Sequence, residues 1–241
     1  MILQDRHREG IRIATNFRHF RNDLICFDRW RFRGLGERHT ANFITHAVRV
    51  CDAYALCHYD AVLYVMKAMC FLGSHMLEDP RFPQLAEALR GSTRYGDTRM
   101  KDFSHNVEAV LTQFAGPELI TYRAFLAAAV TALRDQFSPP AARKYILSNL
   151  PSEVARRIVQ EWRPYLVASA QEAANELGLE GEWSRTICLG SAAILGCKFH
   201  RDPLYPWVQD LTTHGRPDHL DRFLAKRMAK QLRRIEAHYG V

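Results

Sequence analysis

The sequence has no long apolar run. Residues 1–20, MILQDRHREGIRIATNFRHF, alternate charged and apolar side chains and lack the continuous apolar segment of a secretory signal. The longest nearly apolar stretch, residues 61–72, is interrupted by Lys67 and is far shorter than the roughly 20 residues that a membrane-spanning helix needs. We therefore expect a cytoplasmic protein with no membrane partner.

The six cysteines form no Cys-x-x-Cys pair. They lie at irregular spacings among apolar residues, whereas zinc sites and redox-active pairs usually place two cysteines close together in the sequence. This pattern is typical of reduced thiols in a hydrophobic core. We therefore expect neither disulfides nor a cysteine-bound metal.

Common catalytic and ligand-binding motifs are also missing. The sequence contains no glycine-rich phosphate loop, no G-x-S-x-G turn, no H-E-x-x-H motif and no EF-hand loop. Histidine pairs such as His39 with His46 and His214 with His219 lack the i, i+4 spacing of helical metal ligands. We expect a protein without catalytic residues, cofactor or metal, and hence not an enzyme.

What the sequence does contain is the composition of a folded, basic protein. The chain has 241 residues, of which 47% are hydrophobic and 24% charged, enough to form a packed core. Its net charge of +7 permits an acidic protein surface or a nucleic acid as partner. Two segments, Phe-Arg-His-Phe-Arg and Arg-Trp-Arg-Phe-Arg, interleave cations with aromatics as single-strand binders do, so nucleic-acid binding stays open.

Hydrophobic residues recur with the period of an α-helix in most of the chain. The spacing predicts helices over 118–137 and 141–150, and a longer one from Pro151 towards Leu177 with a kink at Pro164. A basic amphipathic helix is expected over 218–239. Period-two alternation is nearly absent, apart from a short segment at 25–32. We therefore predict an all-α helical bundle.

The sequence repeats itself at an offset of 123 residues. The segment AVLYVMKAMCFLGSHMLEDPRFPQL aligns without a gap with SRTICLGSAAILGCKFHRDPLYPWV, and both contain Gly-x5-Asp-Pro-x-aromatic-Pro. We predict a degenerate tandem duplication, with half-repeats 1–115 and 116–241 in one globular unit, 1–241. The shared residues are Gly73, Asp79, Pro80, Phe82 and Pro83 in the first copy and Gly196, Asp202, Pro203, Tyr205 and Pro206 in the second.

Each copy has the pattern of an apolar helix, a turn and a second helix start. The helices at 62–72 and 187–195 are apolar almost all round, so we expect them to be buried against each other with pseudo-twofold symmetry. The glycine suits a left-handed helix cap or a close crossing, the aromatic would hold the turn on the core, and the last proline would begin a short helix. In an alternative interpretation, Asp79 and Asp202 form a symmetric carboxylate pair at a shared site.

The second copy carries the sequence Ile194-Leu195-Gly196, then Phe199, then Asp202-Pro203-Leu204-Tyr205-Pro206-Trp207. This pattern resembles a family of small helical proteins encoded beside effector genes of bacterial type VI secretion systems. The likeness covers about residues 120–214 well and 40–90 more loosely, where Gln84 stands in place of the tryptophan and Met76 in place of Phe199. The family supplies no catalytic residues to carry over.

The resemblance implies a protein-binding role beside a secreted effector. An immunity protein would neutralise its cognate toxin, and the basic charge of this chain fits an acidic toxin surface; an adaptor or chaperone would instead escort the effector to the secretion machine. Aromatic and arginine side chains dominate protein-binding hot spots. The candidate partner-binding residues are Trp30, Trp183, Trp207, Arg222, Arg233 and Arg234.

Overall fold

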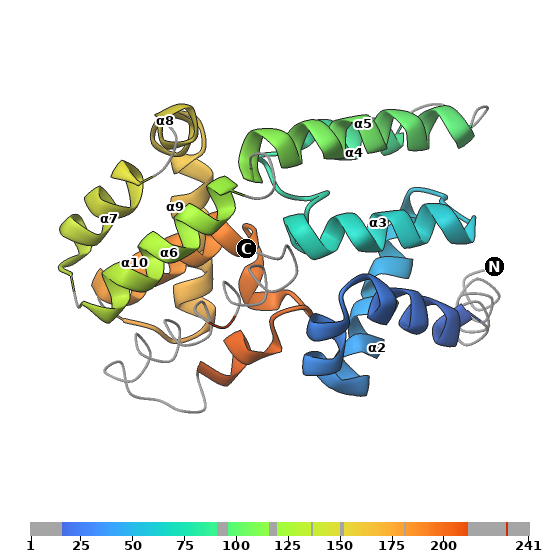
Figure 1. Ribbon diagram of the computed structural model, residues 1–241, viewed down its shortest axis with the longest axis horizontal. Coiled ribbons are helices and arrows are strands. Elements are labelled where there is room, and N and C mark those ends of the chain that lie inside the picture. Colours follow the sequence, from blue (N-terminus) through green and yellow to red (C-terminus); the bar gives the residue numbers. More distant parts are fainter. Residues whose placement is uncertain are drawn as a thin grey trace.

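The fold is all-α, as predicted. The computed structural model describes residues 16–90, 96–115, 120–135, 137–149, 152–180, 182–211 and Lys230. Within these ranges every regular element is a helix and none is a strand (Figure 1). No helix of the described part is both long and apolar enough to cross a membrane. The basic helix predicted over 218–239 lies outside the described residues, apart from Lys230.

Residues 25–32, whose alternation left a strand open, do not form one. Residues 16–27 are helical, and Asp28 caps the next helix by accepting the backbone N–H of Arg31 at 2.9 Å. The helices that follow are α2 (Arg29–Ala53), α3 (Tyr59–Leu72), α4 (Pro83–Arg90) and α5 (Gly96–Ala115).

The second half differs from the prediction between Pro151 and Leu177. One kinked helix was expected there, but the structure has two, and they break at Glu161 and Trp162. Pro164 lies in the first turn of the second helix, where a missing backbone N–H costs nothing. The elements are α6 (Ile120–Arg134), α7 (Pro139–Ser148), α8 (Ser152–Gln160), α9 (Arg163–Glu176), α10 (Glu182–Leu195), and the 3₁₀ turns η2 (Phe199–Arg201) and η3 (Pro206–Leu211).

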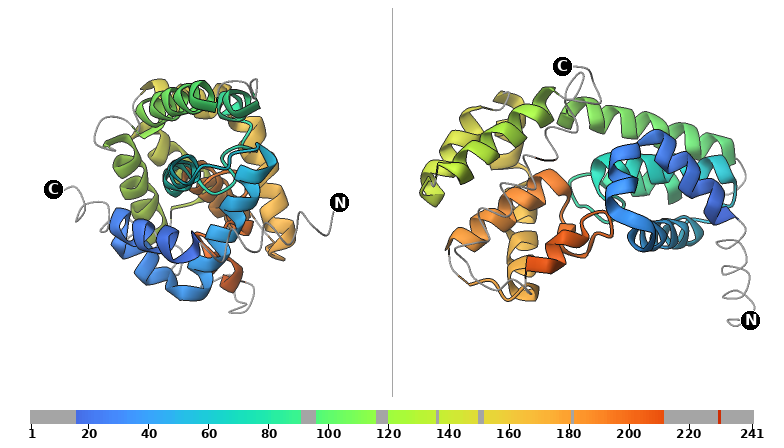
Figure 2. Two further views of the ribbon diagram at one scale, coloured as in Figure 1. Left: turned by 90° about the vertical axis from the view of Figure 1, so that its right-hand side faces the viewer. Right: turned by 60° about the horizontal axis from the view of Figure 1, so that its bottom comes forward.

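The apolar helices α3 and α10 lie at the centre of the molecule and meet at their C-terminal ends. Figure 1 shows them end to end, and the left view of Figure 2 shows α3 end-on with other helices around it. Val62, Val65 and Met66 of α3 have no exposed surface, and Ala192 of α10 has none either. The two helices were expected to pack against each other; in the structure they meet at their ends instead.

Local structure recurs at the offset of the sequence repeat. The bounds of α3 and α10 correspond residue for residue, and α4 and η3 both begin at the last proline of the motif. Gly36 has a non-helical φ of 76° and kinks α2. The corresponding position in the second half lies at the end of α8, just before the break between α8 and α9. Positive φ values also come in pairs: 53° at Ala55 with 62° at Gly178, and 92° at Gly73 with 106° at Gly196.

Backbone hydrogen bonds through the motif also recur at this offset. The common origin of the two halves by duplication stays a prediction, but their local backbone is the same. In the first half the N–H to carbonyl bonds are Gly73 to Met69 (2.9 Å), Met76 to Gly73 (3.1 Å), Phe82 to Asp79 (3.0 Å) and Leu85 to Phe82 (3.1 Å). Their counterparts in the second half, in the same order, are Gly196 to Ala192 (3.2 Å), Phe199 to Gly196 (3.1 Å), Tyr205 to Asp202 (2.9 Å) and Val208 to Tyr205 (2.9 Å).

Candidate functional site

The ends of α3 and α10 form the junction of the two halves. Gly73 and Gly196 follow these helices in backbone conformations that favour glycine. A Cβ atom on Gly73 would lie 2.7 Å from the carbonyl oxygen of Leu195, and one on Gly196 would lie 3.3 Å from that of Leu72. Both glycines therefore follow their helices with a positive φ and lie in close contact with the backbone of the other half, but the two helices meet end to end rather than cross.

Asp79 and Asp202 join the two halves reciprocally. Oδ2 of Asp79 accepts the backbone N–H of Cys197 at 3.1 Å, and Oδ2 of Asp202 accepts that of Ser74 at 2.7 Å. Both side chains are buried, at 4% and 2% exposure. Each aspartate therefore shapes its own turn and holds the turn of the other half. The second oxygen, Oδ1, accepts the N–H two residues along: that of Arg81 at 3.0 Å and that of Leu204 at 2.8 Å.

The carbonyl groups of the same turn residues are held from α2 and α9. Nε2 of His46 lies 3.1 Å from the carbonyl oxygen of Ser74 and donates to it, because a carbonyl can only accept. In the second half, Oγ of Ser169 donates to the carbonyl of Cys197. His46 and Ser169 are also related by the repeat offset, so different side chains serve the same function in the two copies.

Arg81 makes the junction asymmetric. Its Nε and Nη2 donate to both oxygens of Asp79 at 2.9 and 2.7 Å. Its Nη1 donates to the carbonyl oxygen of Ala193 at 3.0 Å, in the last turn of α10, where helix carbonyls lack helical partners. The guanidinium also lies 4.9 Å from the ring centre of Phe82 and 5.8 Å from that of Trp162. The second copy has Leu204 at this position.

The two aspartates consequently differ in electrostatics. Burial acts to raise the pKa of Asp79, but the charge and hydrogen bonds of Arg81 outweigh it and the pKa lies below its usual value. Burial also raises the pKa of Asp202. The backbone hydrogen bonds that this carboxylate accepts offset only part of the rise, so its pKa lies above the usual value. All four carboxylate oxygens accept hydrogen bonds from the protein, which favours a structural role over a shared catalytic site.

An ion pair crosses the junction near the solvent. Lys198, which follows α10, pairs with Glu78 of the first half, whose side chain is 53% exposed. His75 lies beside this pair, 3.8 Å from Glu78, and its ring centre is 4.7 Å from that of His46. Burial and, next, the charge of His46 lower the pKa of His75 to about 4, so this ring is neutral at neutral pH.

The predicted partner-binding residues have different outcomes. Trp30 is 63% exposed, while Trp207 is half-buried and packs against Tyr205. Phe82 and Tyr205 are buried, as expected for residues that hold the turns on the core. The side chain of Trp183 and the residues Arg222, Arg233 and Arg234 lie outside what the structure describes.

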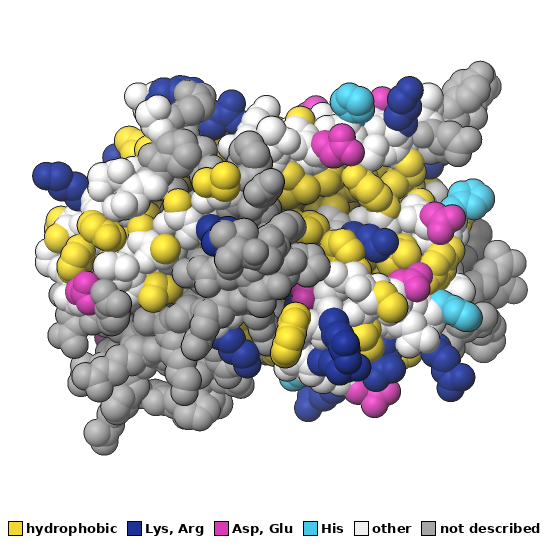
Figure 3. All heavy atoms as spheres, in the orientation of Figure 1, with side chains coloured by type: hydrophobic (Ala, Val, Ile, Leu, Met, Phe, Trp, Pro, Cys, Tyr) yellow, Lys and Arg dark blue, Asp and Glu magenta, His cyan; other side chains and the backbone are white. Residues whose placement is uncertain are grey.

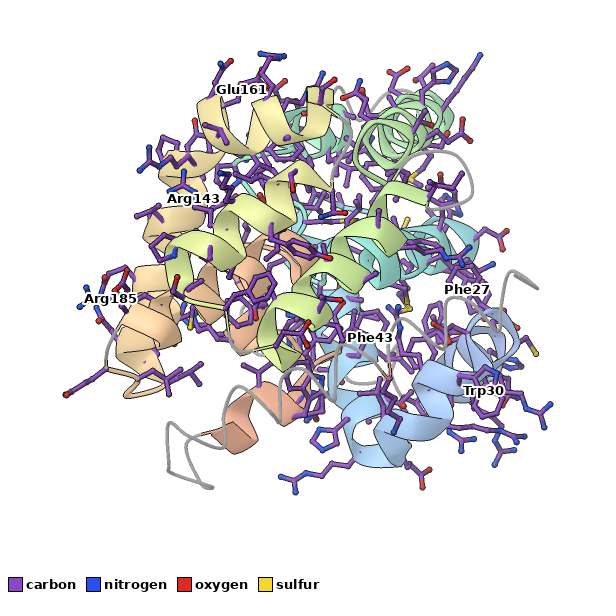
Figure 4. The ribbon with its side chains drawn as sticks, turned by 60° about the vertical axis from the view of Figure 1, so that its left-hand side comes forward. Phe27, Trp30, Phe43, Arg143, Glu161 and Arg185 are labelled. Carbon is purple, nitrogen blue, oxygen red and sulfur yellow. The ribbon has the colours of Figure 1, made fainter. Side chains whose placement is uncertain are left out.

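Trp30 lies on an exposed, basic part of α2. Arg29 and Arg33 flank it and are exposed, and we refer to these three residues as the Trp30 face. Figure 4 shows the indole of Trp30 at the outside of the molecule, and Figure 3 shows lysine and arginine side chains gathered in this region. Arg31 points inward instead, pairing with Asp28 at 3.0 Å and donating to the carbonyl of Cys70.

The other aromatics of the two Arg-rich segments do not share this exposure. Phe20 is 1% exposed and stacks on Tyr59, with ring centres 4.5 Å apart. Phe32 is 2% exposed and packs against Phe43. Trp30 is thus the one well-exposed aromatic of these two segments within the described residues.

A groove lies beside the first Asp-Pro turn. It has a volume of about 400 Å³ and is lined by residues of α4, α5, α8 and α9, among them Arg157 and Tyr165, and by Glu161 and Trp162 between α8 and α9. Tyr165 is 45% exposed, and the neighbouring Val167 is 49% exposed. The second half therefore has an exposed aromatic residue, Tyr165, at this groove, away from the Trp30 face.

Sequence reasoning missed several residues that the fold brings together. Arg81 and His46 are not shared by the two copies of the repeat, because a leucine and a serine stand at the corresponding positions of the second copy. The sequence repeat therefore did not point to either residue. Glu172, Glu176 and His200 also lie close together. The i, i+4 spacing of the two glutamates is visible in the sequence, but the nearness of a histidine on another element is not.

Comparison with family models, with curated proteins and with solved structures finds no match to this chain.

Proposed function

We propose that this chain is a non-enzymatic protein that binds a type VI secretion effector and neutralises it as an immunity protein. The observation that carries the binding role is the exposure of Trp30, 63%, between two exposed arginines. Tryptophan and arginine are the residues most enriched among binding hot spots. Burial of an indole in a partner's pocket removes a large apolar surface from water, which gives about 25 cal/mol per Å².

The chemistry of the Trp30 face favours an acidic partner surface with an apolar pocket. Arg29 and Arg33 surround the indole with positive charge, and the chain as a whole carries a net charge of +7. Complementary charge accelerates association and selects against partners of like charge. An acidic toxin surface fits this pattern better than the basic surface of a nuclease.

The choice of immunity over escort rests on the resemblance at the repeat. An adaptor or chaperone would bind the same effector without abolishing its toxicity. Rescue of cells that express the toxic domain alone therefore separates the two roles, because only an immunity protein restores growth.

Binding to single-stranded nucleic acid receives less support. Such binders stack successive bases on exposed aromatic side chains along a basic groove. Here Phe20 and Phe32 are buried in the core, and Arg31 is paired with Asp28. A single exposed tryptophan offers one stacking surface, which does not form a track along a strand.

The test is an affinity purification of the tagged chain from its native host, with high-salt washes and mass spectrometry of the retained protein. We expect one effector to be retained by the wild type and lost from Trp30→Ala. The matched control is Tyr165→Ala, which removes another exposed aromatic and should retain the effector. Recovery of nucleic acid that is lost as salt is raised, or equal recovery with Trp30→Ala, would contradict the proposal.

A further inference from the structure

The α9 helix and the η2 turn bring three ligand-type side chains together. Glu172 and Glu176 are one helical turn apart on α9, and His200 belongs to η2. One ligand atom from each lies within 4.8 Å of the others. Nε2 of His200 and Oε2 of Glu176 are 3.3 Å apart, and two atoms bound tetrahedrally to one zinc ion at about 2.0 Å are also about 3.3 Å apart.

His200 is an independent indication of a ligand. Its side chain is 1% exposed, and its Nε2 faces Oε2 of Glu176 at 3.3 Å, but neither ring nitrogen makes a hydrogen bond among the described residues. A buried polar group without a partner is costly, and a bound ion is one of the arrangements that satisfies it. A metal ion binds the neutral imidazole through the lone pair of one ring nitrogen.

Arg201 occupies the carboxylates in this structure. Its guanidinium lies 3.1 Å from Glu172 and donates to both oxygens of Glu176, one of them at 3.0 Å. The Arg201 side chain is 47% exposed, so it can rotate into solvent without disturbing the core. A metal ion bound by these two carboxylates would therefore have to displace the guanidinium.

We propose that Glu172, Glu176 and His200 bind one divalent transition-metal ion, with Zn²⁺ as the best fit, in place of the Arg201 guanidinium. Imidazole nitrogen suits zinc and its neighbours, whereas Mg²⁺ and Ca²⁺ prefer oxygen ligands. Two carboxylates balance the charge of the ion, and three protein ligands leave a coordination position for water. The bound ion would tie α9 to the turn that precedes Asp202. This proposal departs from the expectation drawn from the sequence, in which no metal ligands were identified.

The test is a calorimetric titration of the full-length, reduced protein with Zn²⁺, and a parallel titration with Co²⁺ followed by absorption. Cys26 and Cys57 are exposed thiols that can bind either ion, so both are replaced by serine throughout. We expect one ion to bind without the intense near-ultraviolet band of cobalt–thiolate coordination. Glu176→Gln should weaken binding at least tenfold, while Arg201→Ala should tighten it several-fold because the competing cation is removed.

Glu182→Gln is the matched control, because Glu182 is an exposed glutamate at the start of a helix and should leave affinity unchanged. Thermal unfolding establishes that each variant is folded. The proposal is overturned if Glu176→Gln binds the ion as tightly as its parent, or if Arg201→Ala binds it no more tightly. Either result would make Arg201 and the two glutamates an ion-pair network only.

Discussion

The two halves of this chain share a backbone and differ in the side chains that complete it. Asp79 and Asp202 make corresponding hydrogen bonds across the junction, yet Arg81 accompanies the first and Leu204 corresponds to it in the second. His46 and Ser169 likewise serve the same turn carbonyl with different groups. The comparison shows that main-chain geometry at the junction is specified by glycine and aspartate, whereas the charges around it vary between copies.

The largest difference between the halves is expected for Asp79→Asn and Asp202→Asn. Asp79→Asn leaves the buried Arg81 guanidinium without its counter-charge, and breaking a buried ion pair costs about 3–5 kcal/mol. Asp202→Asn removes the acceptor of one backbone N–H but leaves no buried cation unpaired, so it should lower the free energy of unfolding by about 1–3 kcal/mol. Denaturant unfolding of both variants measures the difference, and equal losses would show that Arg81 contributes little.

The two junction glycines give the next largest contrast. A Cβ on Gly73 would lie 2.7 Å from a backbone oxygen that cannot move independently, whereas the corresponding distance at Gly196 is 3.3 Å. Both alanine variants also carry the strain of a positive φ, about 1–3 kcal/mol. We expect Gly73→Ala to destabilise the fold more than Gly196→Ala. The reverse order in unfolding experiments would contradict the close packing described at Gly73.

The pH dependence of the two aspartate variants should have opposite signs. The pKa of Asp79 is lowered in the folded state, so its stabilisation is present above the unfolded pKa of about 4 and is lost as pH falls through the folded value. The pKa of Asp202 is raised in the folded state, so the protonated side chain stabilises the fold below the unfolded pKa of about 4. This contribution is lost as pH rises through the folded value.

The cost of Asp79→Asn should therefore shrink in acid, while that of Asp202→Asn should grow. Unfolding free energies of the wild type and both variants, measured on either side of pH 4, give the two slopes. Parallel slopes would mean that Arg81 does not distinguish the two carboxyl groups.

The smallest contrast is expected at the paired turns that end α2 and α9. Ala55 has a φ of 53° where the second copy has Gly178 at 62°. A left-handed conformation costs a non-glycine residue about 1–2 kcal/mol, offset by the roughly 0.5–1 kcal/mol that glycine loses in entropy. Ala55→Gly should therefore stabilise the protein by up to about 1 kcal/mol, and Gly178→Ala should destabilise it by a similar amount. Thermal unfolding that shows the same sign for both would contradict this account.

Much of the fold could be predicted because the signals were local. Period 3.6 specified the helices, and Gly-x5-Asp-Pro-x-aromatic-Pro specified a cap, a turn and a new helix start at Pro83 and Pro206. The break between α8 and α9 was missed, because Pro164 by itself is compatible with a kink. Its correspondence to the kink at Gly36 emerged only from the structure.

The functional residues were less predictable because they depend on contacts between distant segments. An aspartate before a proline gives no sign that it bonds to the turn of the other half, as Asp79 and Asp202 do. Trp30 and Phe32 belong to one helix and are similar in hydrophobicity, but residues two apart point to different sides. The structure buries Phe32 and exposes Trp30, which periodicity within an Arg-rich segment did not decide.

We propose that the junction maintains the fold while the Trp30 face binds the partner. The most direct test is the affinity of the purified effector for Trp30→Ala, measured beside the unfolding curve of the same variant. We predict a loss of about 2 kcal/mol or more in binding, which is roughly a thirty-fold rise in Kd, with unfolding unchanged to within about 0.5 kcal/mol. An unchanged Kd in a folded variant would contradict the claim and move the interface elsewhere, with the groove beside Tyr165 as the next surface to test.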